Sequence, residues 1–430
     1  MMRKTTISGQ RRGSLIGLCA IIAMGFALVA IPGSAVADES AETPAGWESW
    51  LDNEYFKVNL NVRARIELAD FDGLDSSQAY TVRTRLGIGT KPFYGFSFYA
   101  EGENIFAIND DEYFDVVETP TGQAPIADPE NTELNQLFAR YQNKDALGLD
   151  LKVGRQRVIL DDHRFVGNVG WRQNEQTYDV GLITVSPVEH LSATYGYLWD
   201  IHRIFGDQGP AGLRDLDSQS HVVHFAYDGI EGMTIAAFAY LLDVDDAPGI
   251  SSDSYGFRVT GKRALDGPLS LNYAGSYAIQ TDAASNPVNY TAHYVAAEGG
   301  LTHADVGSLA VGYELLSSDD GKARFVTPLA TAHKFNGWAD VFLNNGGVNG
   351  LQDLYVSIGP KLPWGLKGKL VYHHFWSHED TNSLGDEVDI LLKKPINDHV
   401  TLLTKAAYFD GTSKGPVDRW RYWLEVTFTY

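Results

Sequence analysis

The chain contains almost no cysteine and, beyond its first 37 residues, no long apolar run. Its single cysteine, Cys19, lies near the amino terminus, so the rest of the chain must be stable without disulfides. A membrane helix needs about 20 apolar residues, and no later segment reaches that length. Basic residues are also scarce, 34 against 55 acidic ones, which argues against nucleic acid as a partner.

The amino terminus has the three parts of a secretory signal peptide. A basic start precedes an apolar stretch over residues 15–31 and the small-residue sequence Ala35-Val36-Ala37. We predict cleavage after residue 37, with a retained membrane anchor as the alternative. Cys19 follows Leu18 rather than a small residue, so lipid attachment is not predicted. Cleavage removes four basic residues and no acidic ones, which moves the formal charge from −21 to −25.

The last nine residues alternate between apolar and mostly polar side chains. Tyr422, Leu424, Val426, Phe428 and Tyr430 share one face of an extended strand, which a lipid-facing barrel strand requires. An ordinary half-buried strand of a soluble sandwich is the alternative. Residues 55–68 repeat the pattern, so the ending is not an isolated case.

Similar alternation along the chain predicts about 18 strands. Connections after even-numbered strands are short, and most connections after odd-numbered strands are long and polar, as on the two rims of a membrane barrel. The predicted strands are 55–68, 78–90, 96–107, 132–142, 149–160, 176–186, 190–200, 218–228, 231–242, 253–263, 269–280, 289–301, 306–317, 351–360, 365–376, 386–396, 399–410 and 418–430.

These patterns predict an all-β protein: a transmembrane, antiparallel, up-and-down β-barrel with short periplasmic turns and long extracellular loops. Residues 38–54 form a short periplasmic segment and residues 55–430 the barrel, in the outer membrane of a Gram-negative bacterium. The expected partners are outer-membrane lipid, lipopolysaccharide and the barrel-assembly machinery.

A barrel of this size encloses an aqueous channel, and the strand pattern turns several basic side chains inward. A basic wall attracts anionic solutes. In the alternative, inward acids, namely Glu67, Glu101, Glu103 and Glu425, pair with the arginines and cancel the selectivity. The predicted inward basic residues are Arg63, Arg65, Arg83, Arg85, Arg140, Lys152, Arg258, Lys405 and Arg421.

No cofactor or catalytic motif is predicted. Two acidic loop clusters offer oxygens for Ca²⁺ but lack the spacing of a calcium loop, so solvated acids are the favoured interpretation. His373, His374, His378 and Glu379 do not predict a zinc site, because neighbouring strand residues face opposite sides. The acidic clusters are Asp110, Asp111, Glu112 and Asp115, and Asp243, Asp245, Asp246 and Asp253.

Two motif blocks resemble the alginate-export family of outer-membrane barrels. The first runs from Val153-Gly154-Arg155-Gln156 through Gly170-Trp171-Arg172-Gln173 to Tyr178-Asp179, and the second covers residues 327–340 and 350–353. The resemblance implies an 18-stranded barrel with an Arg-rich pore that passes a polyanionic polysaccharide.

Residues 164–173 and 331–343 fall in long loops, and such loops often fold into the lumen of a barrel. We predict that Arg164, Trp171, Arg172 and Lys334 form an inward-folded constriction, with structural packing of the loops as the alternative.

The predicted function is that of an outer-membrane channel for anionic solutes, with an acidic polysaccharide such as alginate or its oligosaccharides as the expected substrate. A general or small-molecule-selective porin, an outer-membrane enzyme and a structural barrel are the alternatives. No nucleophile elbow, phosphate loop or dinucleotide fingerprint supports an enzyme.

Overall fold

The computed structural model describes residues 53–430 except 118–121, 207–208, 211–212 and 344. The predicted signal peptide and nearly all of the predicted periplasmic segment lie outside the described residues. No helix in the described residues is long and apolar enough to cross a membrane.

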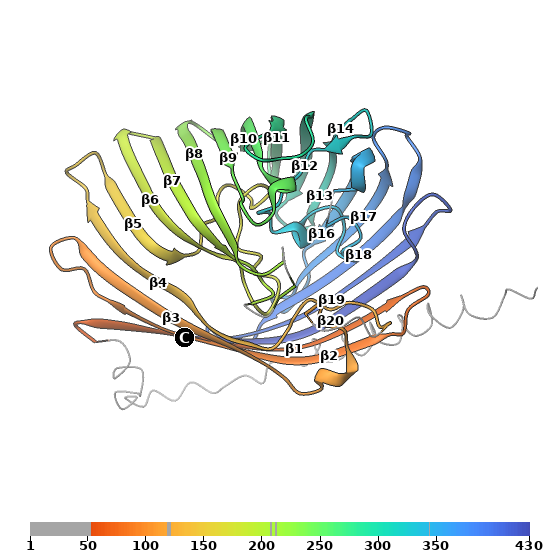
Figure 1. The fold of residues 1–430 in the computed structure, drawn as a ribbon, viewed down its shortest axis with the longest axis horizontal. Helices are drawn as coiled ribbons and strands as arrows, with labels where there is room; N and C mark the ends of the chain where they lie inside the picture. The colour runs from red at the N-terminus through yellow and green to blue at the C-terminus, as the bar shows by residue number, and fades with distance from the viewer. Residues whose placement is uncertain (1–52, 118–121, 207–208, 211–212, 344) are drawn as a thin grey trace, which may run out of the picture.

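Eighteen antiparallel strands form one closed sheet (Figure 1). The first strand, β1, pairs with both β2 and β20, which closes the barrel without a free edge. The barrel strands are β1 (Phe56–Phe71), β2 (Ser77–Thr90), β3 (Phe96–Ala107), β4 (Asn131–Asn143), β5 (Leu149–Gln156), β6 (Thr177–Val188), β7 (Leu191–His202), β8 (Leu216–Ile230), β9 (Met233–Leu242), β10 (Ser252–Ala264), β11 (Leu269–Asp282), β12 (Thr291–His303), β13 (Gly307–Leu316), β16 (Leu351–Pro360), β17 (Lys367–Trp376), β18 (Ser383–Pro395), β19 (Val400–Gly411) and β20 (Arg419–Thr429).

The predicted strand count and alternation are confirmed. On β2, Leu86 and Ile88 are 57% and 50% exposed on the outer face, while Arg83 and Arg85 are only 4% and 8% exposed on the inner face. Apolar side chains therefore face the membrane and polar ones the lumen.

One predicted strand is too long. The fifth was expected to reach residue 160, but β5 ends at Gln156. The chain then leaves the wall, and Arg157 forms ion pairs with Glu101 and Glu175 inside the barrel. These tertiary contacts decide the boundary.

Small elements occupy the loops. A two-stranded hairpin, β14 (Ser318–Asp319) and β15 (Ala323–Arg324), lies outside the main sheet. The 3₁₀ turns are η1 (Asp110–Glu112), η2 (Pro248–Ile250), η3 (Ala332–Lys334) and η4 (Gly347–Asn349).

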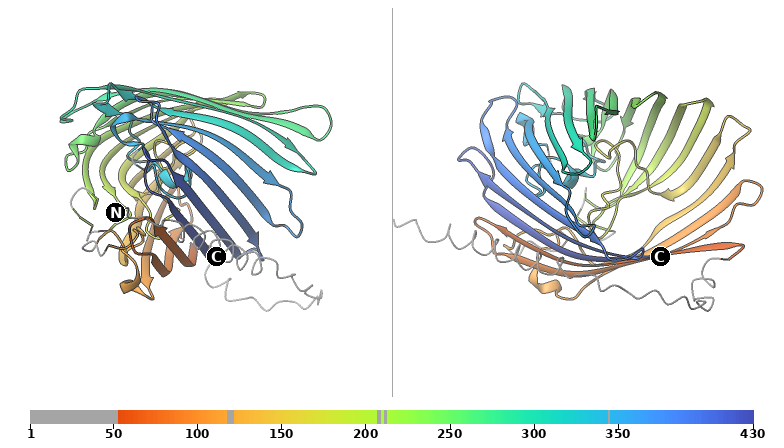
Figure 2. Two further views of the ribbon diagram at one scale, coloured as in Figure 1. Left: turned by 90° about the vertical axis from the view of Figure 1, so that its right-hand side faces the viewer. Right: turned by 180° about the vertical axis from the view of Figure 1, so that it is seen from behind.

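Two long connections turn into the lumen instead of extending outward (Figure 2). Residues 157–176 join β5 to β6, and residues 325–350 join β15 to β16. We call them the first and second plug segments, and together the plug. Most of the large buried apolar cluster lies where the plug packs against the inner wall, with Val166 and Leu329 from the plug and Tyr178 and Leu198 from the strands.

Candidate functional site

The two plug segments are joined by backbone pairing. Val166 and Leu329 form a parallel β-bridge. The amide of Gly167 donates to the Leu329 carbonyl at 2.9 Å, and the amide of Thr331 donates to the His163 carbonyl at 3.0 Å. The segments therefore form one body within the lumen, although the paired residues lie more than 160 positions apart in the chain.

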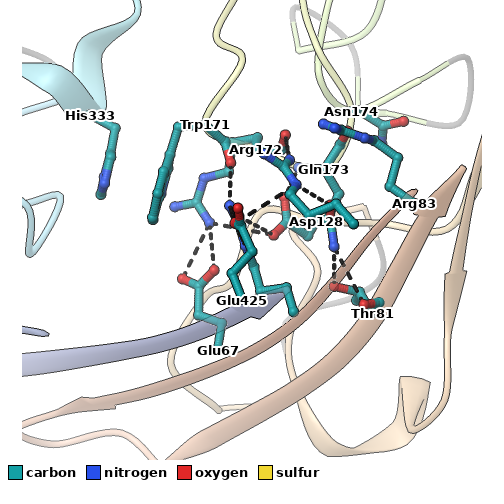
Figure 3. Close-up of polar contacts among 12 residues, drawn as sticks. Glu67, Thr81, Arg83, Asp128, Trp171, Arg172, Gln173, Asn174, His333 and Glu425 are labelled. Carbon is teal, nitrogen blue, oxygen red and sulfur yellow. Dashed lines mark hydrogen bonds and ion pairs between the residues drawn. The ribbon is translucent and has the colours of Figure 1, made fainter. Parts of the chain in front are cut away.

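Six of the predicted inward basic residues form one wall under the plug, on the adjacent strands β19, β20, β1 and β2. Arg63 donates to Gln173 Oε1 at 2.9 Å and to the Gly170 carbonyl at 3.1 Å, and Arg65 donates to the Trp171 carbonyl at 2.7 Å. Figure 3 shows Arg172 and Gln173 of the first plug segment bonded to Glu67 and Thr81 of the wall. All six are 2–8% exposed, so they hold the plug rather than face open water. They are Arg63, Arg65, Arg83, Arg85, Lys405 and Arg421.

Inward acids pair with this wall, as the alternative interpretation expected. Arg65 Nη2 lies 2.7 Å from Glu425 Oε2, and Arg421 Nη1 lies 2.7 Å from Glu67 Oε1. Arg85 is paired with Glu103. In buried pairs of this kind the mutual attraction is largely offset by desolvation, whereas loss of one partner is strongly destabilising.

Arg172 connects the two plug segments to the wall. Its Nη2 lies 2.6 Å from Asp340 Oδ2 in the second segment, and its Nη1 lies 3.2 Å from Glu67 Oε2 on β1. Burial alone would raise the pKa of Asp340, but His333 and Arg172 outweigh it and hold that pKa far below its usual range. The pair is therefore ionised at neutral pH.

Arg164 and Lys334 join the plug to itself and to the opposite wall. Arg164 forms a two-pronged ion pair with Glu314 on β13, with Nε 2.8 Å from Oε1 and Nη2 3.1 Å from Oε2, and Nη2 also donates to Asn336 at 3.0 Å. Lys334 donates to the Asp162 carbonyl at 2.8 Å. The predicted constriction residues thus lie in an inward-folded plug, where they also serve as its structural contacts.

Trp171 is enclosed by cations and an imidazole. The Arg65 guanidinium carbon is 4.4 Å from the centre of its ring, Lys405 Nζ is 4.3 Å from it, and His333 stacks on it at 4.5 Å. Burial lowers the pKa of His333 to about 3, so its imidazole is neutral. Its Nδ1 then donates to Asp340 at 2.6 Å and its Nε2 accepts from Lys405 at 2.6 Å.

The other three predicted wall residues lie elsewhere. Arg140 pairs with Asp150 near the short-turn end, and Lys152 lies over the Phe138 ring at 4.3 Å. Arg258 lies on β10, where its Nη2 is 2.8 Å from Asp162 Oδ2. The predicted wall is therefore not continuous around the barrel.

The plug separates two chambers of different character. The outer chamber, on the long-loop side, measures about 410 Å³ and includes Phe205, Ile250 and Leu343 in its lining. Among its described lining residues, the ionisable ones other than His333 are Arg172, Arg203, Arg324 and Asp340.

The inner chamber, on the strand side of the plug, measures about 290 Å³. Three cations face four carboxylates in its described lining, so positive charge does not prevail. These residues are Arg258, Lys334 and Lys369, and Asp162, Glu298, Glu314 and Asp353.

Arg203 is one of three ionisable outer-chamber residues that sequence reasoning missed, with Arg324 and Asp340. It lies directly after β7, and its guanidinium forms no ion pair with the described residues. Burial lowers the pKa of Arg203, which marks a cation with little local compensation. Its loop position gave no periodic signal. Asp128 was also missed, and Asp340 was missed although it lies within a quoted motif block.

The two acidic loop clusters do not bring their carboxylates together. In the described part of the chain, they are not among the groups of three or more potential metal ligands whose atoms converge. His373 and His374 face opposite sides, as expected, since His373 bonds to Asp353 at 2.9 Å and His374 to Asp386 at 2.6 Å.

Solved structures of outer-membrane proteins have a similar fold. The chain matches OpdK of Pseudomonas aeruginosa, solved with vanillate, with a TM-score of 0.68 and 15% identity over 88% of this chain and 98% of that one. OccK8 (OprE) of the same organism matches with a TM-score of 0.65 and 14% identity, covering 87% and 98%. OccAB4 of Acinetobacter baumannii matches with a TM-score of 0.66 and 14% identity, covering 88% and 98%.

At this identity the likeness concerns the fold alone. No curated protein matches the chain. The family model described as alginate export matches residues 49–399. Since that match spans most of the chain, and the barrel has the architecture of Gram-negative outer-membrane porins, the protein belongs to the alginate export family of the outer membrane.

Proposed function

We propose that this porin-like barrel passes small anionic organic solutes, which enter through the outer chamber. The observation that carries the proposal is the charge of that chamber. Asp340 is already paired with Arg172, whereas Arg203 forms no ion pair with the described residues. A carboxylate entering there gains a charge-assisted contact, and guanidinium groups suit carboxylates geometrically.

The lining also fits a solute with an apolar body. Phe205, Ile250 and Leu343 lie in the same chamber as Arg203, and ligand sites usually combine apolar walls with a few polar groups. OpdK was solved with vanillate. A solute of that general kind, an apolar body with one carboxylate, matches this lining.

The family description favours a second class of solute, acidic saccharides such as alginate oligosaccharides. Chambers of about 410 and 290 Å³ suit short fragments. We propose that a longer acidic polysaccharide passes only when the plug leaves the lumen. The same barrel contacts outer-membrane lipid and lipopolysaccharide and is inserted by the barrel-assembly machinery. We assign it transport rather than catalysis because its family and fold are those of channels.

Planar-bilayer recording tests the selectivity. Under a salt gradient, the reversal potential of the purified barrel should indicate anion preference. Arg203→Gln should reduce that preference, whereas Lys322→Gln, in the exposed hairpin outside the chamber, should not. A cation preference in the unmodified protein would overturn the proposal.

Current block separates the solute classes. Aromatic carboxylates and short uronate oligomers of increasing length are added on each side in turn. Block that weakens in Arg203→Gln supports entry through the outer chamber, and the solute that blocks at the lowest concentration identifies the class. If neutral sugars block the current as strongly as both kinds of anion do, the channel does not recognise anions.

A further inference from the structure

A separate cluster of ligand-type side chains lies at the long-loop end of β6 and β7. Tyr178 and Val180 are fully buried toward the plug, so Asp179 between them lies on the outer face of the strand. It pairs in register with Asp200 on β7. The register shifts here by one residue, and such bulges commonly redirect side chains.

His202 completes the cluster. Its Nε2 is 3.2 Å from Asp179 Oδ2 and 3.8 Å from Asp200 Oδ2. Tetrahedral zinc, with bonds of about 2.1 Å, separates neighbouring ligand atoms by roughly 3.4 Å. In the described part of the chain, this is the only group of three potential ligands whose atoms lie within 4.8 Å of one another.

The orientation of His202 supports a ligand role. The residue is 4% exposed, and its Nδ1 lies 2.5 Å from Asp215 Oδ2. If Nδ1 donates to Asp215, the lone pair of Nε2 points toward Asp179 and Asp200. A carboxylate that holds the far nitrogen is the usual support of a metal-binding histidine.

Two atoms of the cluster lack a hydrogen bond. Oδ1 of Asp200 is buried and forms none, and buried Nε2 of His202 faces Asp179 Oδ2 at 3.2 Å without meeting hydrogen-bond geometry. Buried polar atoms are nearly always satisfied, and an exception calls for an explanation such as a bound ion. Both atoms belong to the same cluster, so one ion accounts for them together.

The charges also suit a divalent cation. Arg155 holds Asp179, with Nε 3.0 Å from Oδ1 and Nη2 3.3 Å from Oδ2. With a neutral imidazole, three carboxylates and one guanidinium leave two negative charges. A proton on His202 offsets half of this, and a divalent ion offsets all of it.

We propose that Asp179, Asp200 and His202 bind one divalent transition-metal ion of the zinc class, with Asp215 as the positioning residue. An imidazole in the ligand set favours zinc over calcium and magnesium, which prefer oxygen throughout. The site lies outside the lumen and does not depend on the proposed transport.

The test uses the full barrel in detergent, freed of any histidine tag and stripped with a chelator. Zn²⁺ is titrated by calorimetry, and Co²⁺ is added separately because its visible spectrum reports tetrahedral coordination. We expect one ion per chain and no comparable binding of Ca²⁺. Absence of Zn²⁺ binding, or preference for Ca²⁺, would overturn the proposal without any variant.

Variants locate the ion. His202→Ala and Asp200→Asn should each lower Zn²⁺ affinity by a hundredfold or more, and Asp215→Asn by about 10- to 100-fold. His224→Ala is the matched control, since His224 lies beside the single carboxylate of Asp161 at 3.1 Å. If both His202→Ala and Asp200→Asn fold and bind Zn²⁺ with unchanged affinity, the proposed site is wrong. If His202→Ala does not fold, the Zn²⁺ affinity of Asp200→Asn decides.

Discussion

The two chambers on either side of the plug have different balances of charge. In the outer chamber, Arg203 faces apolar side chains and has no ion pair with the described residues. In the inner chamber, Arg258 and Lys334 are held by Asp162, and carboxylates match the cations. A channel must bind a solute well enough to admit it and weakly enough to release it. If the barrel passes anions as proposed, this difference assigns recognition to the outer chamber and release to the inner one.

The largest expected effect comes from removing the separation between the chambers. Arg172→Ala leaves Glu67 and Asp340 without the guanidinium that joins them. Removing one partner of a buried pair costs about 3–5 kcal/mol, so we expect the plug to detach and single-channel conductance to rise severalfold. Bilayer recording measures this. Unchanged conductance with unchanged selectivity would mean that the plug has other sufficient anchors.

Reversing the charge of Arg203 in the outer chamber should have the next largest effect, on ion selectivity. Arg203→Glu changes its charge by two units. Two unit charges 4 Å apart in water-like surroundings interact by about 1 kcal/mol, which corresponds to roughly a fivefold change in an equilibrium constant. We therefore expect the anion-to-cation permeability ratio to fall at least fivefold. Lys369→Glu makes the same charge change in the inner chamber, and an equal effect there would abolish the distinction between the chambers.

Acid should loosen the plug only at low pH. Burial alone would raise the pKa of Glu175, but Arg85 and Arg157 outweigh it and lower that pKa to about 2. Because its pKa is depressed, ionised Glu175 stabilises the docked plug fully above about pH 4.3, which is the ordinary pKa of glutamate. This stabilisation is lost as the pH falls toward 2. Conductance should stay constant from pH 8 to 5 and rise below about pH 4. A rise between pH 7 and 5 would point to a different titrating group.

The smallest effect is expected away from both chambers. Arg140 pairs with Asp150 near the short-turn end, where the two side chains are 36% and 27% exposed. Such pairs contribute about 0–1 kcal/mol. Arg140→Gln should therefore leave selectivity nearly unchanged and shift the melting temperature by only a few degrees, as followed by circular dichroism. A marked loss of anion preference would extend the recognition region to the inner mouth.

The strands were predictable because alternation is a local property. The outer face of a barrel must be apolar along every strand, so the pattern of β2 or β20 can be read from the residues themselves. The same alternation identified the inward arginines. It failed at the end of β5, where contacts of Arg157 with Glu101 and Glu175 draw the chain inward.

The candidate site was only partly predictable. Loop length and the motif blocks pointed to Trp171 and Arg172, which lie in the plug as expected. Arg203 and the cluster of Asp179, Asp200 and His202 carried no periodic signal. The path of a loop and a β-bulge position these residues, and the alternation of apolar and polar residues predicts neither.

The amino-acid sequence by itself determined the barrel, its strand number and which side chains face inward, because lipid on one side and water on the other impose a period of two. Only the tertiary structure decided whether the inward arginines line open water or hold a plug. That outcome depends on two loops that meet inside the lumen although their paired residues, Val166 and Leu329, lie more than 150 positions apart in the chain. It also depends on carboxylates from several strands and loops, which pair with the basic residues of the wall and neutralise their charge.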